Sequence, residues 1–254
     1  MELGLAGKHA LITGGSKGIG RAVAEVFAEE GCNLTLVARD TAALDEAAVA
    51  IRARRKVRVA IISADLSIEG AARRVVAAAG EVDILVNNAG AIPPGSLVEV
   101  EDEAWRQAWD LKVFGFISLS RSVYLSMAAR KSGVIVNIIG RAGQNPTPGY
   151  IVGASGNAAL MAFTRALGVG APADGIRVVG INPGPIATER MQMLHRADAA
   201  RLLGDPSRWR EISKNLPFGR PGRPEEIAYA TAFLASPVSD YTNATILSID
   251  GGSA

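Results

Sequence analysis

The sequence predicts an α/β fold in which a doubly wound parallel sheet of about seven strands lies between two helical layers. Three observations support this prediction. Short apolar runs alternate with helical patterns along the chain of 254 residues. The alternation has no break that would mark a second domain. Glycine-rich or polar motifs follow several of the apolar runs, where strands of a parallel sheet would end. We therefore expect a single domain, 1–254, with a three-layer αβα architecture.

The first strand–helix unit sets the pattern. An apolar run at 9–12 predicts a buried strand, and a helical pattern at 21–28 stops at Gly31. The other strands are predicted from short apolar and β-branched runs at 33–38, 57–62, 83–86, 134–138, 176–181 and 245–249. The other helices are predicted at 41–55, 67–79, with Ser67 as the cap, 103–130, 153–169 and 224–235. Segment 188–216 is helical in pattern but is broken at 204–206, which we interpret as a cover over the substrate.

The stretch 13–20, Thr-Gly-Gly-Ser-Lys-Gly-Ile-Gly, lies between the first strand and its helix. The free N–H groups of a first helical turn converge on one point, and glycines let a phosphate approach the backbone closely. A glycine-rich turn alone is weak support for a nucleotide site. Asp65, residues 87–90 and residues 182–184 also follow predicted strands. Because ligands of such sheets bind beyond the carboxyl ends of the strands, these motifs together predict a dinucleotide site.

Composition excludes other classes of protein. The formal net charge is +2, too small to indicate a nucleic-acid partner, and the basic run 52–56 fits a solvated helix end. The single cysteine, Cys32, excludes an internal disulfide and suits a reducing compartment. Residues 1–4 lack a secretory leader pattern, and no apolar run approaches membrane length. No cluster of cysteine, histidine and carboxylate indicates a metal site. We expect a cytoplasmic protein with a small-molecule substrate, no nucleic-acid partner and no membrane partner.

These motifs resemble those of the short-chain dehydrogenase/reductase family over nearly the whole chain. Residues 13–20 resemble its glycine loop, 65–66 its adenine-binding acidic pair, 87–90 its Asn-Asn-Ala-Gly motif and 182–188 its nicotinamide segment. Residues 219–227 and 250–252 resemble its C-terminal signature. The resemblance implies a Rossmann-type fold and assigns cofactor contacts to Gly14, Ser16, Lys17, Gly18, Ile19, Gly20, Arg39, Asp65, Leu66, Asn88, Ala89, Gly90, Pro183, Gly184, Ile186 and Thr188.

Two cations predict the form of the cofactor. A carboxylate after the second strand would bind a ribose 2′-OH, but this chain has Arg39 there and Lys17 in the glycine loop. Both side chains favour a 2′-phosphate, which Arg39 can bind with a guanidinium fork. The alternative is that both are solvated surface charges. We predict NADP(H) rather than NAD(H).

The family's usual catalytic Asn, Ser, Tyr and Lys are absent from the positions where the resemblance would place them. Those positions hold Lys112, Gly140, Gly153 and Asn157. Hydride delivery to a carbonyl places negative charge on its oxygen, so an acid must supply a proton. Neither glycine can do so. The usual mechanism therefore does not carry over to this chain.

Other residues are candidates to replace the missing set. Lys112 and Asn157 resemble an exchange of the family's Asn and Lys, and a desolvated lysine could donate a proton near neutral pH. Lys112 could instead extend to solvent or bond to Asn157. Tyr150 could swing into the space left by Gly153, or could be an ordinary aromatic at the rim. Ser155 is expected to spend its hydroxyl on the local backbone, and His195 is expected at the surface.

Two functions remain open from the sequence. The first is an NADP(H)-dependent reductase with a non-standard proton donor, which acts on a carbonyl, imine or activated alkene. Glycines 140, 153 and 156 would widen its pocket for a bulky group. The second is a catalytically inactive NADP(H)-binding protein, such as a cofactor sensor or a partner-supporting subunit. The resemblance also implies a homotetramer or homodimer, with helices 103–130 and 153–169 at one interface.

Overall fold

A computed structural model describes residues 2–214 and 216–252, and it contains the predicted seven-stranded parallel sheet. The strands lie side by side in the order β3-β2-β1-β4-β5-β6-β7. Their bounds are β1 His9–Thr13, β2 Asn33–Ala38, β3 Val59–Ser63, β4 Ile84–Asn87, β5 Gly133–Ile138, β6 Ile176–Pro183 and β7 Ile246–Ile249. The predicted α/β fold class is confirmed.

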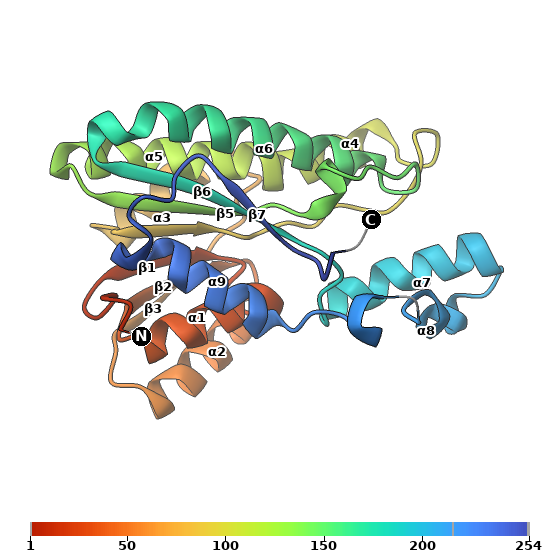
Figure 1. The fold of residues 1–254 in the computed structure, drawn as a ribbon, viewed down its shortest axis with the longest axis horizontal. Coiled ribbons are helices and arrows are strands. Elements are labelled where there is room, and N and C mark those ends of the chain that lie inside the picture. The colour runs from red at the N-terminus through yellow and green to blue at the C-terminus, as the bar shows by residue number, and fades with distance from the viewer. Residues whose placement is uncertain (1, 215, 253–254) are drawn as a thin grey trace.

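Helices cover both faces of the sheet (Figure 1). The helices α1, α2 and α9 lie on one side, and α4, α5 and α6 on the other. Their bounds, with those of α3, are α1 Gly18–Glu29, α2 Thr41–Arg54, α3 Ala71–Ala79, α4 Asp102–Trp109, α5 Gly115–Arg130, α6 Ile151–Gly170 and α9 Pro224–Ala235. Alternate residues of β1 point into two different cores, Ile12 into one and Leu11 into the other. Because both faces are buried, the central strands are almost continuously apolar.

The order of the strands along the chain reverses direction at β1. From β1 the chain continues to β2 on one side and later returns to place β4 on the other side. In such sheets this reversal opens a crevice at the carboxyl ends of the strands, where ligands bind. The helices α7, Glu189–Leu203, and α8, Trp209–Ile212, lie beyond the body of the sheet (Figure 1). Segment 188–216, the expected cover, is helical and interrupted, as its pattern predicts. Its residue Asn215 lies outside the described residues.

Two elements differ from prediction. The third helix begins at Ala71 with Gly70 before it, and Ser67 does not cap it, because the Ser67 hydroxyl donates to the Asp65 carboxylate instead. The predicted long helix 103–130 is two helices separated by a π-helical turn, Asp110–Phe114, which carries Lys112. Hydrophobic periodicity does not distinguish such a π-helical turn from an α-helix. Such turns often occur at functional sites. No helix among residues 2–214 and 216–252 is long and apolar enough to span a membrane.

Candidate active site

The Thr13 side chain joins the glycine loop to the end of β4. Its hydroxyl oxygen accepts hydrogen bonds from the backbone N–H groups of Asn88, at 2.9 Å, and Ala89, at 3.0 Å. In return, the Asn88 amide donates to the Thr13 carbonyl at 3.0 Å. Two motifs that lie 75 residues apart in sequence therefore form one rigid floor at the reversal of strand order.

The loop above this floor is too tight for side chains. A Cβ at Gly20 would lie 2.1 Å from the Gly14 carbonyl oxygen, and a Cβ at Gly14 would lie 2.7 Å from the Asn88 amide nitrogen. Gly14 also has φ +64°, which favours glycine. No side chain caps the start of α1, so the N–H groups of its first turn remain available to an anion. Thr188 approaches from the opposite side and lies beside Gly18. These features fit a dinucleotide pyrophosphate.

Two cations flank the loop in exposed ion pairs. The Arg39 guanidinium lies 3.9 Å from the Asp65 carboxylate, and the Lys17 ammonium lies 3.3 Å from that of Glu189. Their side chains are 63% and 77% exposed, so both pairs exchange readily with a bound anion. The Ser67 hydroxyl donates to Asp65 and holds the pKa of that carboxyl below its usual range, and Arg39 adds to the effect. Asp65 therefore stays ionised and able to accept hydrogen bonds.

The remaining predicted cofactor residues lie at the same edge. Ser16 and Ile19 belong to the loop and first turn after β1, and Leu66 and Gly90 follow β3 and β4. Segment 183–188 begins with the last residue of β6 and continues beyond the strand. That segment holds the last three predicted cofactor residues not yet placed: Pro183, Gly184 and Ile186. The structure thus brings together the predicted set, which is drawn from five different strand ends.

Lys112 lies half-buried on the π-helical turn. Its ammonium donates to the Ile139 carbonyl, which follows β5, at 2.5 Å. Its methylene groups pack against Gly90, where a Cβ would lie 3.0 Å from the lysine Cδ. Desolvation, with a smaller contribution from the Arg190 guanidinium, lowers the pKa of Lys112 from its ordinary 10.5 to about 7. The side chain therefore points inward from the helix, and the alternative that it extends to solvent is wrong.

Asn157 lies beside Lys112 but is not bonded to it. The Asn157 side chain, 2% exposed, instead fills the space beside Gly140, where a Cβ would lie 2.8 Å from the amide nitrogen. The two side chains thus flank consecutive residues, Ile139 and Gly140, after β5. The oxygen of the Asn157 side-chain amide is buried and accepts no hydrogen bond from residues 2–214 or 216–252. A buried unpaired acceptor is costly, so this oxygen is available to a donor from a ligand or water.

The Tyr150 ring occupies the space beside Gly153. A Cβ at Gly153 would lie 2.0 Å from the Tyr150 ring atom Cε1 and 2.2 Å from Cζ. The tyrosine precedes α6, and its ring folds back over the first turn of that helix. The Arg190 guanidinium donates to the Tyr150 hydroxyl oxygen at 3.2 Å and also to the Ile92 carbonyl. A phenol, an ammonium and a guanidinium are therefore brought to one region.

Sequence reasoning missed Arg190. It lies two residues after Thr188, in the first turn of α7, the predicted cover. That position is itself a usable signal, because the first turn of the helix that follows β6 lies near the edge of the sheet where ligands bind. The composition of the segment gave no such indication.

The expected widening of the pocket by three glycines is not found. The Tyr150 ring covers Gly153, and the Asn157 amide fills the space at Gly140. Gly156 packs against Val113 and the Trp109 indole, with the nearest atom 3.2 Å from a built Cβ. Neighbouring side chains have taken up the space, which periodicity and motif spacing cannot reveal. The site is repacked rather than emptied.

Two other sequence predictions have clear outcomes. The Ser155 hydroxyl donates to the Ile151 carbonyl at 2.5 Å, as predicted for a residue bound to its local backbone. His195 is wrongly predicted at the surface, because it is 8% exposed and its Nδ1 lies 2.8 Å from the Ser213 hydroxyl. Burial lowers the pKa of His195. The His195 ring therefore links α7 to the residue Ser213 further along the chain.

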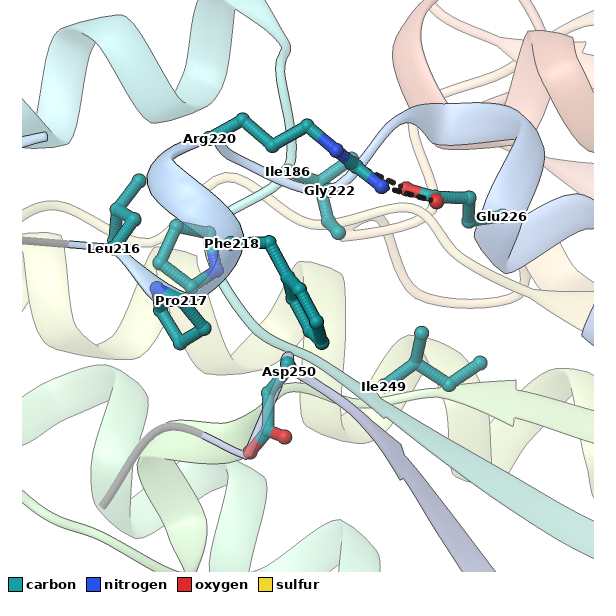
Figure 2. Close-up of a pocket in the computed structure, with 11 residues that line it drawn as sticks. Ile186, Leu216, Pro217, Phe218, Arg220, Gly222, Glu226, Ile249 and Asp250 are labelled. Carbon is teal, nitrogen blue, oxygen red and sulfur yellow. Dashed lines mark hydrogen bonds and ion pairs between the residues drawn. The ribbon is translucent and has the colours of Figure 1, made fainter.

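A cavity of about 210 Å³ lies at the carboxyl ends of β6 and β7, bordered by Ile186 (Figure 2). Figure 2 shows the ion pair between Arg220 and Glu226 at one side, with two hydrogen bonds of 2.8 and 2.9 Å. Phe218 and Ile249 also line this cavity. It borders the segment after β6, but the cluster around Lys112 does not line it.

Comparison with known proteins gives matches over most of the chain. Residues 8–199 match the short chain dehydrogenase family. The 3-oxoacyl-[acyl-carrier-protein] reductase FabG of Chlamydia muridarum is 34% identical over 254 residues, which cover 98% of each chain.

Solved structures agree with this match. An L-sorbose reductase from Gluconobacter frateurii, complexed with NADPH and L-sorbose, superposes with a TM-score of 0.91 at 34% identity. The match covers 99% of this chain and 98% of that one. An NAD+-bound xylitol dehydrogenase also superposes with a TM-score of 0.91, at 26% identity, over 98% of this chain and 99% of the other.

Proposed function

Since the chain belongs to the short-chain dehydrogenase/reductase family, we propose that it is an NADP(H)-dependent reductase with an unusual proton donor, Lys112. The observation that carries this proposal is the half-buried Lys112 ammonium, whose pKa is lowered to about 7. It lies against the Ile139 carbonyl, beside a complete set of family cofactor motifs. A general acid is most effective when its pKa lies near the working pH.

The charges around the cofactor loop support NADP(H) over NAD(H). The solved neighbours include one bound to NADPH and one bound to NAD+, so the fold alone does not choose. In this chain Arg39 and Lys17 flank the loop, and their exposed ion pairs with Asp65 and Glu189 cost little to exchange. A 2′-phosphate gives Arg39 two parallel charge-assisted hydrogen bonds in their place.

The bound cofactor supplies a hydride, and the chain supplies the proton and the position of the substrate. The carbonyl carbon of the substrate accepts the hydride, and its oxygen takes a proton from the Lys112 ammonium. Lys112 is left neutral and regains its proton from solvent. Arg190 holds the Tyr150 phenol by its oxygen, which leaves the phenol O–H free to donate to the same substrate oxygen. Asn157 offers the unpaired oxygen of its side-chain amide to a hydrogen-bond donor of the ligand.

The substrate class follows from this chemistry. A carbonyl, an imine or an activated alkene accepts a hydride and a proton in this way, and a positioned acid accelerates such reactions by about 10²–10⁴. We also propose that the whole chain acts as one cofactor-binding domain, with segment 188–216 as its cover. A homotetramer or homodimer in the cytoplasm is the expected setting.

The proposal is tested by titration of the protein with NADPH and NADH, followed by nicotinamide fluorescence, and by assay of Lys112→Met. We expect tighter binding of NADPH than of NADH. Lys112→Met should keep its NADPH affinity and lose about 10²–10⁴ in turnover of a carbonyl, imine or enone panel. The matched control is Lys8→Met, at an exposed lysine remote from the site, which should behave as wild type.

Two results would contradict the proposal. If neither cofactor binds, the motifs are only a scaffold and the reductase hypothesis fails. If NADPH binds but no compound is reduced by the wild-type protein, the catalytically inactive NADP(H)-binding protein is the better description.

A further inference from the structure

Two cations meet at the candidate site, and no carboxylate of residues 2–214 and 216–252 forms an ion pair with either of them. The Arg190 guanidinium donates to the Ile92 carbonyl and to the Tyr150 hydroxyl, and the Lys112 ammonium donates to the Ile139 carbonyl. All these acceptors are neutral. Both cations are half-buried, and they lie close enough for Arg190 to depress the ionisation of Lys112. Thirteen ion pairs are formed within the described part of the chain, and neither residue takes part in one.

This arrangement differs from that of other arginines in the chain. Arg21, Arg55 and Arg208, for example, are each within 3.2 Å of a carboxylate oxygen. A half-buried cation without a counter-charge loses part of its hydration and gains little in return. An anion that enters the site supplies the missing counter-charge and forms charge-assisted hydrogen bonds with the guanidinium fork.

We propose that the substrate is a short oxo acid whose carboxylate binds the Arg190 guanidinium while its carbonyl oxygen faces Lys112. This inference rests on the proposed reductase function and names its substrate class. A guanidinium has five N–H donors, and the Ile92 carbonyl and the Tyr150 hydroxyl both bond to a single nitrogen of Arg190. The N–H groups on its other nitrogens can therefore bind the two oxygens of the carboxylate. The Tyr150 ring over Gly153 leaves no room for a bulky substituent at that point, which favours a small acid.

The reaction balances with this assignment. The ketone carbon takes the hydride, and the π electron pair of the C=O bond moves to the oxygen. That oxygen takes the proton from Lys112, and a hydroxy acid is released together with the oxidised cofactor. The carboxylate is unchanged throughout. Arg190 therefore acts as a specificity-determining residue, since it contacts the substrate but not the reacting bond.

The test compares matched acids and esters: pyruvate with methyl pyruvate, acetoacetate with methyl acetoacetate, and levulinate with methyl levulinate. Each pair differs in charge and keeps the same ketone. We expect wild type to reduce at least one acid with a kcat/KM about tenfold or more above that of its ester. Arg190→Gln should lose about tenfold or more with the acid, and less with the ester. Arg196→Gln removes an exposed charge from the same helix and should match wild type.

Calorimetry of the same acids with the NADP+ complex gives a second readout that needs no turnover. Wild type should bind the preferred acid, and Arg190→Gln should bind it about tenfold or more weakly. If the ester is reduced as well as the acid, or if Arg190→Gln loses equally with both, the inference fails while the reductase function stands. If no compound is reduced, the reductase function fails, and loss of acid binding in Arg190→Gln still decides whether the site holds a carboxylate.

Discussion

A methyl group at position 153 tests whether the Tyr150 ring occupies the space beside Gly153. In Gly153→Ala the new Cβ would lie 2.0 Å from Cε1 and 2.2 Å from Cζ of the Tyr150 ring. Carbon atoms that are not bonded to each other do not approach so closely, so the Tyr150 ring must move. The Tyr150 hydroxyl then loses its 3.2 Å hydrogen bond from Arg190.

The expected magnitude follows from opposing contributions. Overpacking costs about 1–3 kcal/mol, and the lost hydrogen bond costs about 0.5–1.5 kcal/mol. Replacing a helical glycine by alanine returns about 0.5–1 kcal/mol. We therefore expect the free energy of unfolding of Gly153→Ala to fall by about 1–3 kcal/mol. Its turnover should fall too, with NADPH affinity retained.

Gly156→Ala is the matched control, on the same helix and one turn further on. Its Cβ would meet Val113 at 3.2 Å, a contact that a small shift relieves. We expect this variant to stay within about 1 kcal/mol of wild type. Urea denaturation and steady-state assays of both variants compare them directly. Equal stability and equal turnover of Gly153→Ala and Gly156→Ala would refute the assignment of Tyr150 to the vacated space.

Three further predictions follow from the site. Gly140→Ser should not gain turnover. Its Cβ would lie 2.8 Å from the Asn157 amide nitrogen, and residue 140 has a φ of +133°, which side chains rarely adopt. Denaturation should therefore show that the free energy of unfolding falls by about 1–3 kcal/mol. Between pH 7 and 10.5 the unfolded chain binds more protons at Lys112 than the folded chain, so the free energy of unfolding should rise with pH across that window, by no more than roughly 5 kcal/mol. Lys112→Met should flatten that rise in urea titrations at several pH values, and an unchanged slope would argue against a depressed pKa. Arg39→Asp should lower NADPH affinity by about tenfold or more and raise NADH affinity, which fluorescence titration measures. An unchanged preference for NADPH over NADH would show that Arg39 does not bind the 2′-phosphate.

The fold and the cofactor edge could be predicted because each depends on local patterns. Strands were recognised from apolar runs, and Gly14 and Gly20 from the glycine-rich motif between a strand and a helix. The structure shows the close backbone approach at both glycines. Motif spacing also selected Lys112 and Asn157, whose side chains the structure places beside the consecutive residues Ile139 and Gly140. These signals are written in consecutive residues, so a single sequence contains them.

The arrangement of the repacked site could not be predicted in this way. The Lys112 ammonium bonds the Ile139 carbonyl rather than Asn157, because a π-helical turn sets the direction of the side chain. His195 was expected at the surface, but the fold of the cover buries it against Ser213. Arg190 reaches the site from a helix whose placement depends on tertiary packing. Contacts between distant segments decide all three outcomes.

The pH dependence of single-turnover NADPH oxidation, compared between wild type and Lys112→Met, tests the central claim most directly. Protonated Lys112 is the proposed acid, and the groups around it are the Arg190 guanidinium and the Tyr150 phenol. We predict that the wild-type rate falls about tenfold per pH unit above about 7. Lys112→Met should be about 10²–10⁴ slower and should lack that step. If the variant keeps both the rate and the step of the wild type, Lys112 is not the proton donor.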